Sequence, residues 1–153
     1  VGCMAFARRA PPGPQSVQFS ANVSGVRTDF VVTDFGSQLF FVITQNMKIG
    51  SMIEATASEA KEEATGLEGG QAERIYEVRV LFGDRSLEHY RAYARAIVEV
   101  VASRGCPKSV LLGIALKEHS MEGFRQILSE IKSRIGPVTA PPPDDLDLVP
   151  PPP

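Results

Sequence analysis

The sequence predicts an α+β fold, in which about six mainly antiparallel strands form one sheet and two helices cover one face of it. Three observations predict this class. Short apolar and β-branched runs separated by turn residues fill the first half of the 153-residue chain, as in antiparallel strands. Two stretches in the second half repeat apolar residues at spacings of three and four, the period of an amphipathic helix. A near-continuous apolar run at residues 110–116 precedes the second stretch and is typical of a strand buried on both faces.

Four strands joined by short turns are predicted in the first half, where they would form an antiparallel meander. The run LFFVI, residues 39–43, is the most apolar short run of the chain and predicts a central strand. Phe30, Val31 and Val32 are consecutive, so the middle of the second strand is expected to be buried on both sides. The four predicted strands are residues 16–23, 26–35, 39–43 and 51–56.

The second half begins with an acidic, glycine-containing loop at residues 57–73, followed by a fifth strand at 75–82. Ser86, or Asp84 before it, is expected to cap the first helix, and a Gly-Cys-Pro turn at 105–107 is expected to end it. The apolar stripe of this helix is Leu87, Tyr90, Ala94, Ile97, Val98 and Val101.

The last predicted elements are the strand at 110–116 and a helix that Ser120 caps. Gly136 and Pro137 end this helix. Its apolar stripe is Met121, Phe124, Leu128, Ile131 and Ile135.

One domain is expected, at residues 16–136, with a mobile acidic loop at 57–73. Residues 1–15 and 137–153 are rich in proline and are expected to be disordered tails, because such composition cannot build a core.

The composition excludes several classes of function. A formal net charge of −2 and the lack of any polybasic block argue against a nucleic-acid partner. No apolar run approaches ~20 residues, so neither a transmembrane helix nor a membrane partner is expected. Cys3, in a tail, and Cys106, in a turn, are not expected to form a disulfide, which favours a reducing compartment. We therefore expect a cytoplasmic protein, with the nucleus also open.

The inventory of catalytic residues is close to empty, so the sequence predicts a binding protein that is not an enzyme. His89 and His119 have no Cys, Asp or Glu at a metal-ligand spacing and are expected at the surface. Cys106 follows the C-terminal end of a helix, where the helix dipole disfavours a thiolate. The sequence has no Walker A, GxGxxG or GxSxG motif. We expect no catalytic residue, no metal ligand and no cofactor.

A dimer is the expected way to cover the second face of the sheet. The runs at 39–43 and 110–116 are apolar at both parities, so the face that the helices leave uncovered is expected to be apolar too. A second sheet from another chain would bury it face to face. The alternative is that the long loop or a tail folds over this face. The residues expected to bind the partner are Phe40, Val42, Leu112 and Ile114.

Three segments carry a resemblance to a known family. VLLGIALKEHSMEGFRQILSEI, residues 110–131, resembles the C-terminal signature of the proteasome assembly chaperone 3 family, with SMEG at the start of the last helix. TDFGSQLFFVITQNMKIGSM, residues 33–52, is similar to the central hairpin of that family, and VRVLFGDR at 78–85 matches as well. The chain departs from the family in its longer acidic loop at 61–71 and in both proline-rich tails.

The resemblance implies a small non-enzymatic chaperone that pairs with a related chaperone, number 4, and binds α-subunits to help build the α-ring of the 20S proteasome. It also implies a dimer in which two sheets pack face to face with the helices outside, and it leaves a homodimer open beside the heterodimer. Two other functions remain as alternatives: a small α+β enzyme that uses Cys106 or His119, and a generic adaptor that binds through its proline-rich tail.

Overall fold

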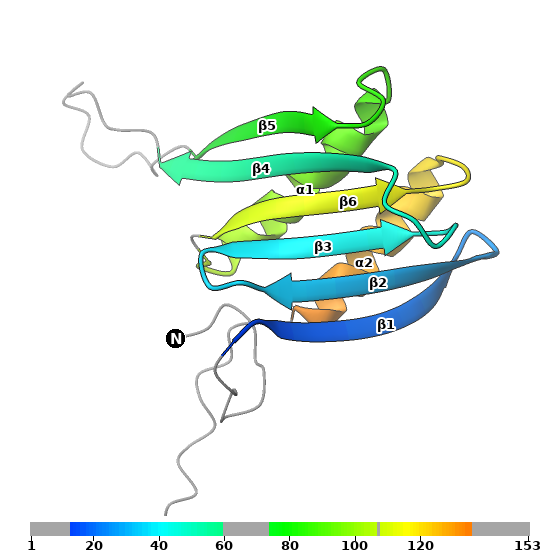
Figure 1. Cartoon of the computed structure of the whole chain (residues 1–153), viewed down its shortest axis with the longest axis horizontal. Coiled ribbons are helices and arrows are strands. Elements are labelled where there is room, and N and C mark those ends of the chain that lie inside the picture. The colour runs from blue at the N-terminus through cyan, green and yellow to red at the C-terminus, as the bar shows by residue number, and fades with distance from the viewer. Residues whose placement is uncertain (1–12, 60–73, 107, 136–153) are drawn as a thin grey trace, which may run out of the picture.

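The computed structural model describes residues 13–59, 74–106 and 108–135 of the chain. These residues form six strands and two helices in the order that the sequence predicts (Figure 1). The elements are β1 (Gln15–Val23), β2 (Val26–Asp34), β3 (Gln38–Thr44), β4 (Ser51–Glu59), β5 (Arg74–Phe82), α1 (Glu88–Ser103), β6 (Ser109–Ala115) and α2 (Met121–Arg134). β1 extends one residue into the segment predicted as a tail, and β4 extends three residues into the segment predicted as a loop. The rest of the two predicted tails and of the acidic loop lies outside the described residues.

The six strands form one mixed sheet with the order β1-β2-β3-β6-β4-β5. β1, β2 and β3 are an antiparallel meander, as predicted. β4 does not continue this meander, which corrects the expectation of four consecutive neighbours. Instead β6 lies between β3 and β4, where it is parallel to β3 and antiparallel to β4. Because β6 carries apolar residues on both faces, it is best buried at the centre of the sheet.

Both helices lie on one face of the sheet, which confirms the predicted α+β class (Figure 1). Alternate residues of the strands point toward the helices and form the core with them. Tyr93, Ile97 and Ile131 come from the helices, and each is at most 1% exposed. The strand residues that join them in the core include Phe30, Val32, Leu39, Phe41, Ile43, Ile53, Val110, Leu112 and Ile114.

The two helix starts differ in how they are capped. The side chain of Ser120 accepts a hydrogen bond from the backbone N–H of Gly123 at 3.0 Å, which confirms Ser120 as the cap of α2. The cap position of α1 is Leu87, which offers no side-chain hydrogen bond, so the prediction of a Ser86 or Asp84 cap is wrong. Asp84 instead accepts hydrogen bonds from the backbone and side chain of Ser86 within the preceding turn.

The apolar stripes of the helices differ from the prediction at Tyr93 of α1, which the prediction omitted and which is 1% exposed, and at two positions of α2. Met121 lies at the first turn and is 61% exposed, so it does not belong to the buried stripe. Ile127, which the prediction omitted, is 1% exposed and packs in the core. The buried face of α2 is therefore rotated slightly from the stripe that the spacing predicts.

Candidate partner-binding surface

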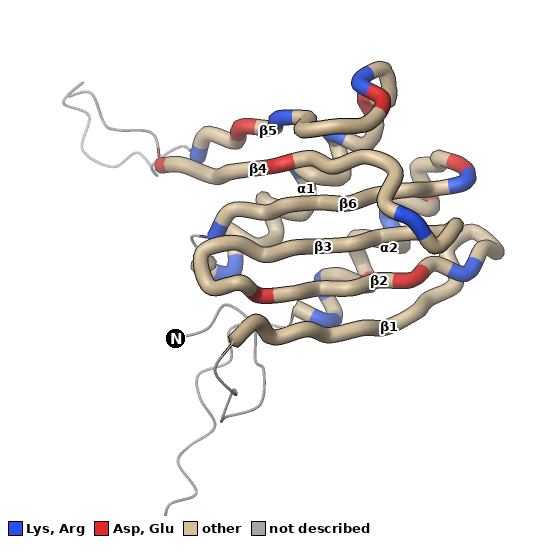
Figure 2. The backbone as a smooth tube through the Cα atoms, viewed as in Figure 1, with Lys and Arg blue, Asp and Glu red and all other residues tan. Residues whose placement is uncertain are grey.

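The face of the sheet turned away from both helices, called the open face below, carries an apolar stripe across its central strands. Cross-strand registry places Val31 beside Val42, and Phe40 beside Leu111. Met52 is in register with Gly113 on the same face. The apolar stripe consists of Val31, Phe40, Val42, Met52 and Leu111, all of which are half-buried in the chain alone. β3 and β6 carry no charged residue along their length (Figure 2).

Two exposed segments extend this apolar surface. The connection between β3 and β4 carries Met47 and Ile49, which are 85% and 41% exposed. A Cβ atom at Gly113 would lie 2.9 Å from Cγ2 of Ile49, so Ile49 packs directly over the glycine in β6. In the β2–β3 connection, Phe35 is 55% exposed and packs against Phe40 with ring centroids 6.4 Å apart. Large exposed apolar surfaces of this kind are typical of protein–protein interfaces.

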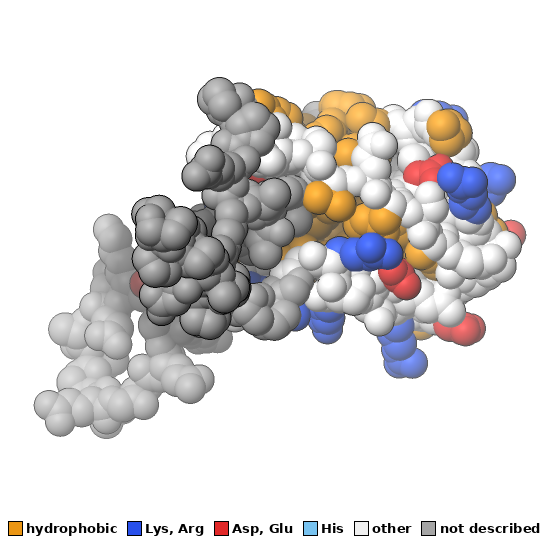
Figure 3. Space-filling model, turned by 90° about the horizontal axis from the view of Figure 1, so that it is seen from below, with side chains coloured by type: hydrophobic (Ala, Val, Ile, Leu, Met, Phe, Trp, Pro, Cys, Tyr) orange, Lys and Arg blue, Asp and Glu red, His pale blue; other side chains and the backbone are white. Residues whose placement is uncertain are grey.

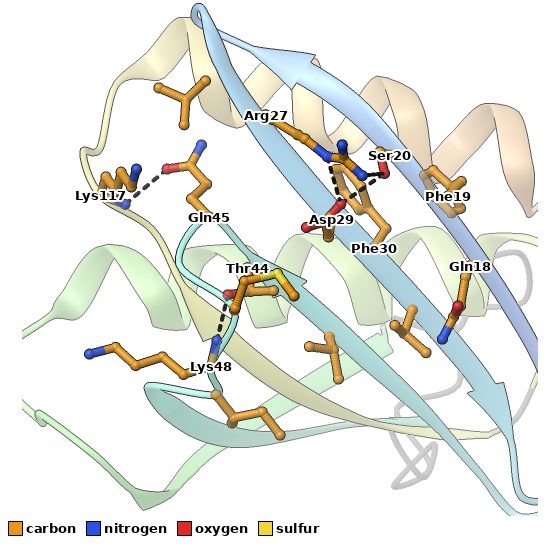
Figure 4. A pocket seen from close by; sticks show the side chains of 15 residues that line it. Gln18, Phe19, Ser20, Arg27, Asp29, Phe30, Thr44, Gln45, Lys48 and Lys117 are labelled. Carbon is orange, nitrogen blue, oxygen red and sulfur yellow. Dashed lines mark hydrogen bonds and ion pairs between the residues drawn. The ribbon is translucent and has the colours of Figure 1, made fainter.

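A groove of about 960 Å³ lies on the open face, between the β3–β4 connection and strands β1 and β2 (Figure 4). Its apolar lining includes Val31, Val42, Met47 and Ile49. The hydroxyl of Thr44 positions the β3–β4 connection, because it accepts hydrogen bonds from the backbone N–H groups of Asn46 and Lys48 at 3.3 and 3.2 Å. The connection that borders the groove is thus tied to the end of β3. Seen from the β1 side, hydrophobic side chains reach the surface beside charged ones (Figure 3).

Polar side chains flank the apolar stripe on both sides. On β1 and β2, Asp29 accepts hydrogen bonds from the side chains of Ser20 and Arg27 at 2.8 and 3.2 Å (Figure 4). The Ser20 hydrogen bond, and after it the Arg27 guanidinium, lower the pKa of Asp29 against an opposing effect of burial. On β4 and β5, Arg79 and Glu54 form an ion pair at 2.6 Å. An apolar centre with a polar rim is the usual anatomy of a protein interface.

The four predicted partner-binding residues divide between the two faces of the sheet. Phe40 and Val42 lie on the open face, and their binding of a partner stays a prediction. Leu112 and Ile114 are 0% exposed and lie in the core beneath the helices, so the expectation that they lie on the uncovered face is wrong. Registry explains the difference, since Leu112 pairs with Phe41 and not with Phe40. The open-face residues that the prediction missed include Val31, Met52 and Leu111.

The two histidines lie together at the start of α1. The rings of His89 and His119 stack with centroids 4.4 Å apart. His119 is exposed, as predicted, whereas His89 is half-buried. Burial, and then the neighbouring His119, lower the pKa of His89. Among the described residues, no group of three or more His, Cys, Asp or Glu side chains could hold a metal ion.

Burial also acts on a tyrosine beside this pair. Tyr93 packs edge-on against His119 and Phe124, with centroid distances of 5.9 and 4.7 Å. Desolvation, and then the neighbouring Tyr90, raise the pKa of Tyr93 to about 12. The Tyr93 hydroxyl is therefore neutral at physiological pH, and the cluster is a packing unit between the two helices.

Cys106 is buried and disulfide-bonded. This contradicts the expectation that the cysteine in this turn is unpaired, and with it the basis for inferring a reducing compartment; Cys3 lies outside the described residues. A pocket of about 280 Å³ brings Cys106 beside Glu59 and Arg74. A disulfide sulfur is not a thiolate nucleophile, so this pocket does not form a thiol-based active site. None of the described helices is long and apolar enough to cross a membrane.

Known proteins resemble this chain over most of its described length. The family model for proteasome assembly chaperone 3 matches residues 41–134, which is more than half of the chain. A protein from Nematostella vectensis named proteasome assembly chaperone 3 is 28% identical over 120 residues, covering 78% of this chain and 88% of its own length. The protein of that name from Homo sapiens is 30% identical over 118 residues, covering 76% of this chain and 89% of its own length.

A solved structure shares the fold. The match is a chain from the crystal structure of a chaperone complex for yeast 20S proteasome assembly, with a TM-score of 0.59 and 17% identity. The match covers 80% of this chain and 99% of the solved chain.

Proposed function

This chain belongs to the proteasome assembly chaperone 3 family, and from that membership we propose that it is a non-enzymatic chaperone that assists assembly of the 20S proteasome. The observation that carries this proposal is the match to the family model over residues 41–134, and the apolar stripe on the open face agrees with it. A chaperone of assembly needs a surface that binds another protein, and the open face supplies one.

The partner of the open face is a second sheet, contributed by a related chaperone such as proteasome assembly chaperone 4 or by a second copy of this chain. Face-to-face sheet packing buries alternate side chains of each strand, and the apolar stripe presents such side chains on four adjacent strands. The ion pairs Arg27–Asp29 and Arg79–Glu54 would lie toward the rim of this interface. The paired chaperones then bind α-subunits of the 20S proteasome. The proposed place of action is the cytoplasm, with the nucleus also open.

Neither alternative function gains support from a specific observation. Cys106 is buried and disulfide-bonded, and the His119 ring stacks on His89 and packs edge-on against Tyr93. The proline-rich tail through which an adaptor would bind lies outside the described residues.

The proposal is tested by affinity purification of the tagged chain from its native cell. The expected result is recovery of proteasome α-subunits together with one small partner chaperone, or with untagged copies of the same chain. Recovery of neither α-subunits nor a chaperone would overturn the proposal.

A matched pair of variants assigns the interaction to the open face. Phe40→Glu places a charge at the centre of the apolar stripe, and its burial without a partner charge is unfavourable. Thr56→Glu introduces the same charge on the open face of β4, beside Glu77 of the edge strand β5. Phe40→Glu is expected to abolish recovery of the partner, whereas Thr56→Glu retains it, and circular dichroism verifies that both variants fold. Wild-type recovery with Phe40→Glu would exclude the open face as the interface.

A further inference from the structure

We propose that the acidic segment at residues 144–149 of this chain occupies the open-face groove and is displaced when the partner sheet binds. The proposal rests on the proposed function, because it assigns a regulatory competitor to the same surface. Three features of the groove and of the segment carry it: the charge of the groove, the alternation of the segment, and the position at which the segment leaves the fold.

The groove carries an excess of positive charge. Its lining contains three cationic side chains, Arg27, Lys48 and Lys117, and one carboxylate, Asp29. Arg27 is paired with Asp29, whereas Lys48 and Lys117 form no ion pair with any residue in the described part of the chain. Both lysines are exposed at the end of the groove where β3 ends and the β6–α2 connection begins (Figure 4). The groove therefore suits an anionic occupant.

The occupant must also be apolar on one side, because the groove has an apolar lining. Val31 and Val42 belong to the sheet, and Met47 and Ile49 border the groove from the β3–β4 connection. Residues 144–149 read DDLDLV, in which aspartate and leucine alternate from Asp145 onward. In an extended chain, alternate side chains point to opposite sides, so the leucines can face the valines while the aspartates face the lysines. This pairing satisfies both chemical demands of the groove.

The sign of charge selects this segment among the three that lie outside the described residues. Residues 136–153 contain three aspartates and no Lys or Arg. Residues 1–12 contain Arg8 and Arg9 and no acidic residue, so they have the same sign as the lysines. Residues 60–73 connect β4 to β5 at the opposite edge of the sheet from β1 and β2. Only the C-terminal segment combines negative charge with a start near the groove.

The end of α2 lies close enough for the segment to reach. The guanidinium of Arg134 lies over the Phe19 ring, 4.7 Å from its centroid, and Phe19 is itself one of the residues that line the groove. The chain must therefore pass only around the edge strand β1 to reach the open face. The nine residues that follow Ile135, up to Asp144, span up to about 30 Å when extended, which exceeds the thickness of one sheet.

The decisive experiment neutralises the segment in the full chain, without the partner. The backbone amide shifts of Val31, Lys48 and Ile49 are compared by NMR between the wild type and D144N/D145N/D147N. These shifts are expected to differ between the two proteins by the same amount at every protein concentration measured. The shifts of the distant strand β5 are expected to stay the same. Unchanged shifts, or changes that disappear on dilution because the segment comes from a second copy, would overturn the proposal. The substituted residues lie outside the described fold, so a failure to fold does not obscure the result.

A charge exchange tests the direct contact. K48E/K117E is expected to change the amide shift of Val31, which is remote in sequence from both substitutions, as D144N/D145N/D147N does, and combining it with D144K/D145K/D147K is expected to restore this shift. The matched control R125E/K132E reverses two exposed charges on α2 and should leave the groove unaffected. Failure of the exchange to restore the shifts would overturn the assignment of Lys48 and Lys117 as the sites of contact.

Competition with the partner is measured last, with the chaperone recovered in the affinity purification. D144N/D145N/D147N is expected to bind it at least about fivefold more tightly than the wild type, the lower end of ordinary coupling between sites. If the two proteins bind the partner with equal affinity although their amide shifts differ, the segment does not compete with the partner, and this part of the proposal is overturned. If no partner binds either protein, the proposed function fails, while the amide shifts still decide whether the segment occupies the groove.

Discussion

Leu112 and Phe40 lie on neighbouring strands, in apolar runs of similar composition, yet they face opposite sides of the sheet. Leu112 is 0% exposed in the core beneath the helices, and Phe40 is half-buried on the open face beside Leu111. Leu112 therefore contributes to the core of the chain, whereas Phe40 is available to a partner, even though the sequence around them does not distinguish the two positions.

The first prediction concerns the stability of the isolated chain. Leu112→Ala is expected to lower the free energy of unfolding by about 2–5 kcal/mol, because the shortened side chain leaves a cavity in the core. Phe40→Ala, the matched control on the open face, is expected to cost clearly less in a monomer. Urea denaturation at a concentration that keeps the chain monomeric measures both. An equal loss for the two variants would mean that Phe40 is already covered within the chain.

The second prediction concerns pH. The pKa of His89 is lowered from 6.5 in the folded chain, chiefly by burial, so the unfolded chain binds the proton more tightly. The stability contributed by neutral His89 is fully present above pH 6.5 and is lost as the pH falls through the lowered folded pKa. In His89→Gln, the midpoint of thermal unfolding is expected to fall less between pH 7.5 and pH 5 than it does in the wild type. A wild-type slope in this variant would exclude His89 as its source.

The parity of these apolar runs explains which residues could be predicted and which could not. β6 contains no charged residue, and its one polar side chain, Ser109, stands at its first position, so the apolar run does not indicate which parity faces the helices, and the prediction placed Leu112 on the wrong face. The strand at residues 17–23 differs, because its regular alternation of polar and apolar residues correctly indicates that one face is exposed to solvent. The stacking of His89 on His119 was also beyond the sequence, since 30 residues separate them and no motif joins them.

Among the elements, α2 begins at the residue that the sequence predicts. Ser120 caps it as predicted, and Lys132 and Arg134 occupy its last turn, where cations interact favourably with the helix dipole. Arg134 also lies over the ring of Phe19, which fixes the end of the helix to the edge strand β1.

The third prediction concerns the cap of α2. Ser120→Ala is expected to lower the free energy of unfolding by about 1 kcal/mol, because the Gly123 N–H loses its side-chain acceptor. Ser120→Asp supplies another acceptor and should retain most of the stability. Ser133→Ala is the control, since the exposed Ser133 hydroxyl only donates to the carbonyl of Glu130 within the helix. Equal stability of Ser120→Ala and the wild type would mean that the Ser120 cap does not stabilise α2.

The position of β6 was the main error at this scale. Sequential strands are usually neighbours, and the short β3–β4 connection suggested a hairpin. A strand that is apolar on both faces nevertheless belongs in the centre of a sheet. Between β3 and β4, β6 forms hydrogen bonds along both of its edges. The apolar composition of β6 therefore indicates its central position, whereas the lengths of the turns do not.

At the scale of the whole molecule, both helices cover one face of the sheet, and the open face carries the apolar stripe. The apolar stripe, Met47, Ile49 and Phe35 together make the open face a surface that is more stable when covered. A partner that binds only the folded chain through this face would raise the stability of the fold by mass action.

The fourth prediction follows from this linkage. The midpoint of thermal unfolding is expected to rise with protein concentration over a hundredfold range if the chain pairs with itself, and to rise on adding the partner chaperone if it pairs with that protein. Differential scanning calorimetry measures both, with Phe40→Glu as the variant that should show neither rise. A midpoint independent of concentration and of the partner would mean that the open face is not covered by association.

The central position of β6 has a consequence for how the protein is made. Translation releases β1–β5 before β6, so the nascent chain holds two partial sheets whose inner edges, on β3 and β4, have no strand between them. Unpaired edges of apolar strands are prone to join the wrong chains. The sheet can close only when residues 109–115 have left the ribosome and β6 pairs with both of these edges.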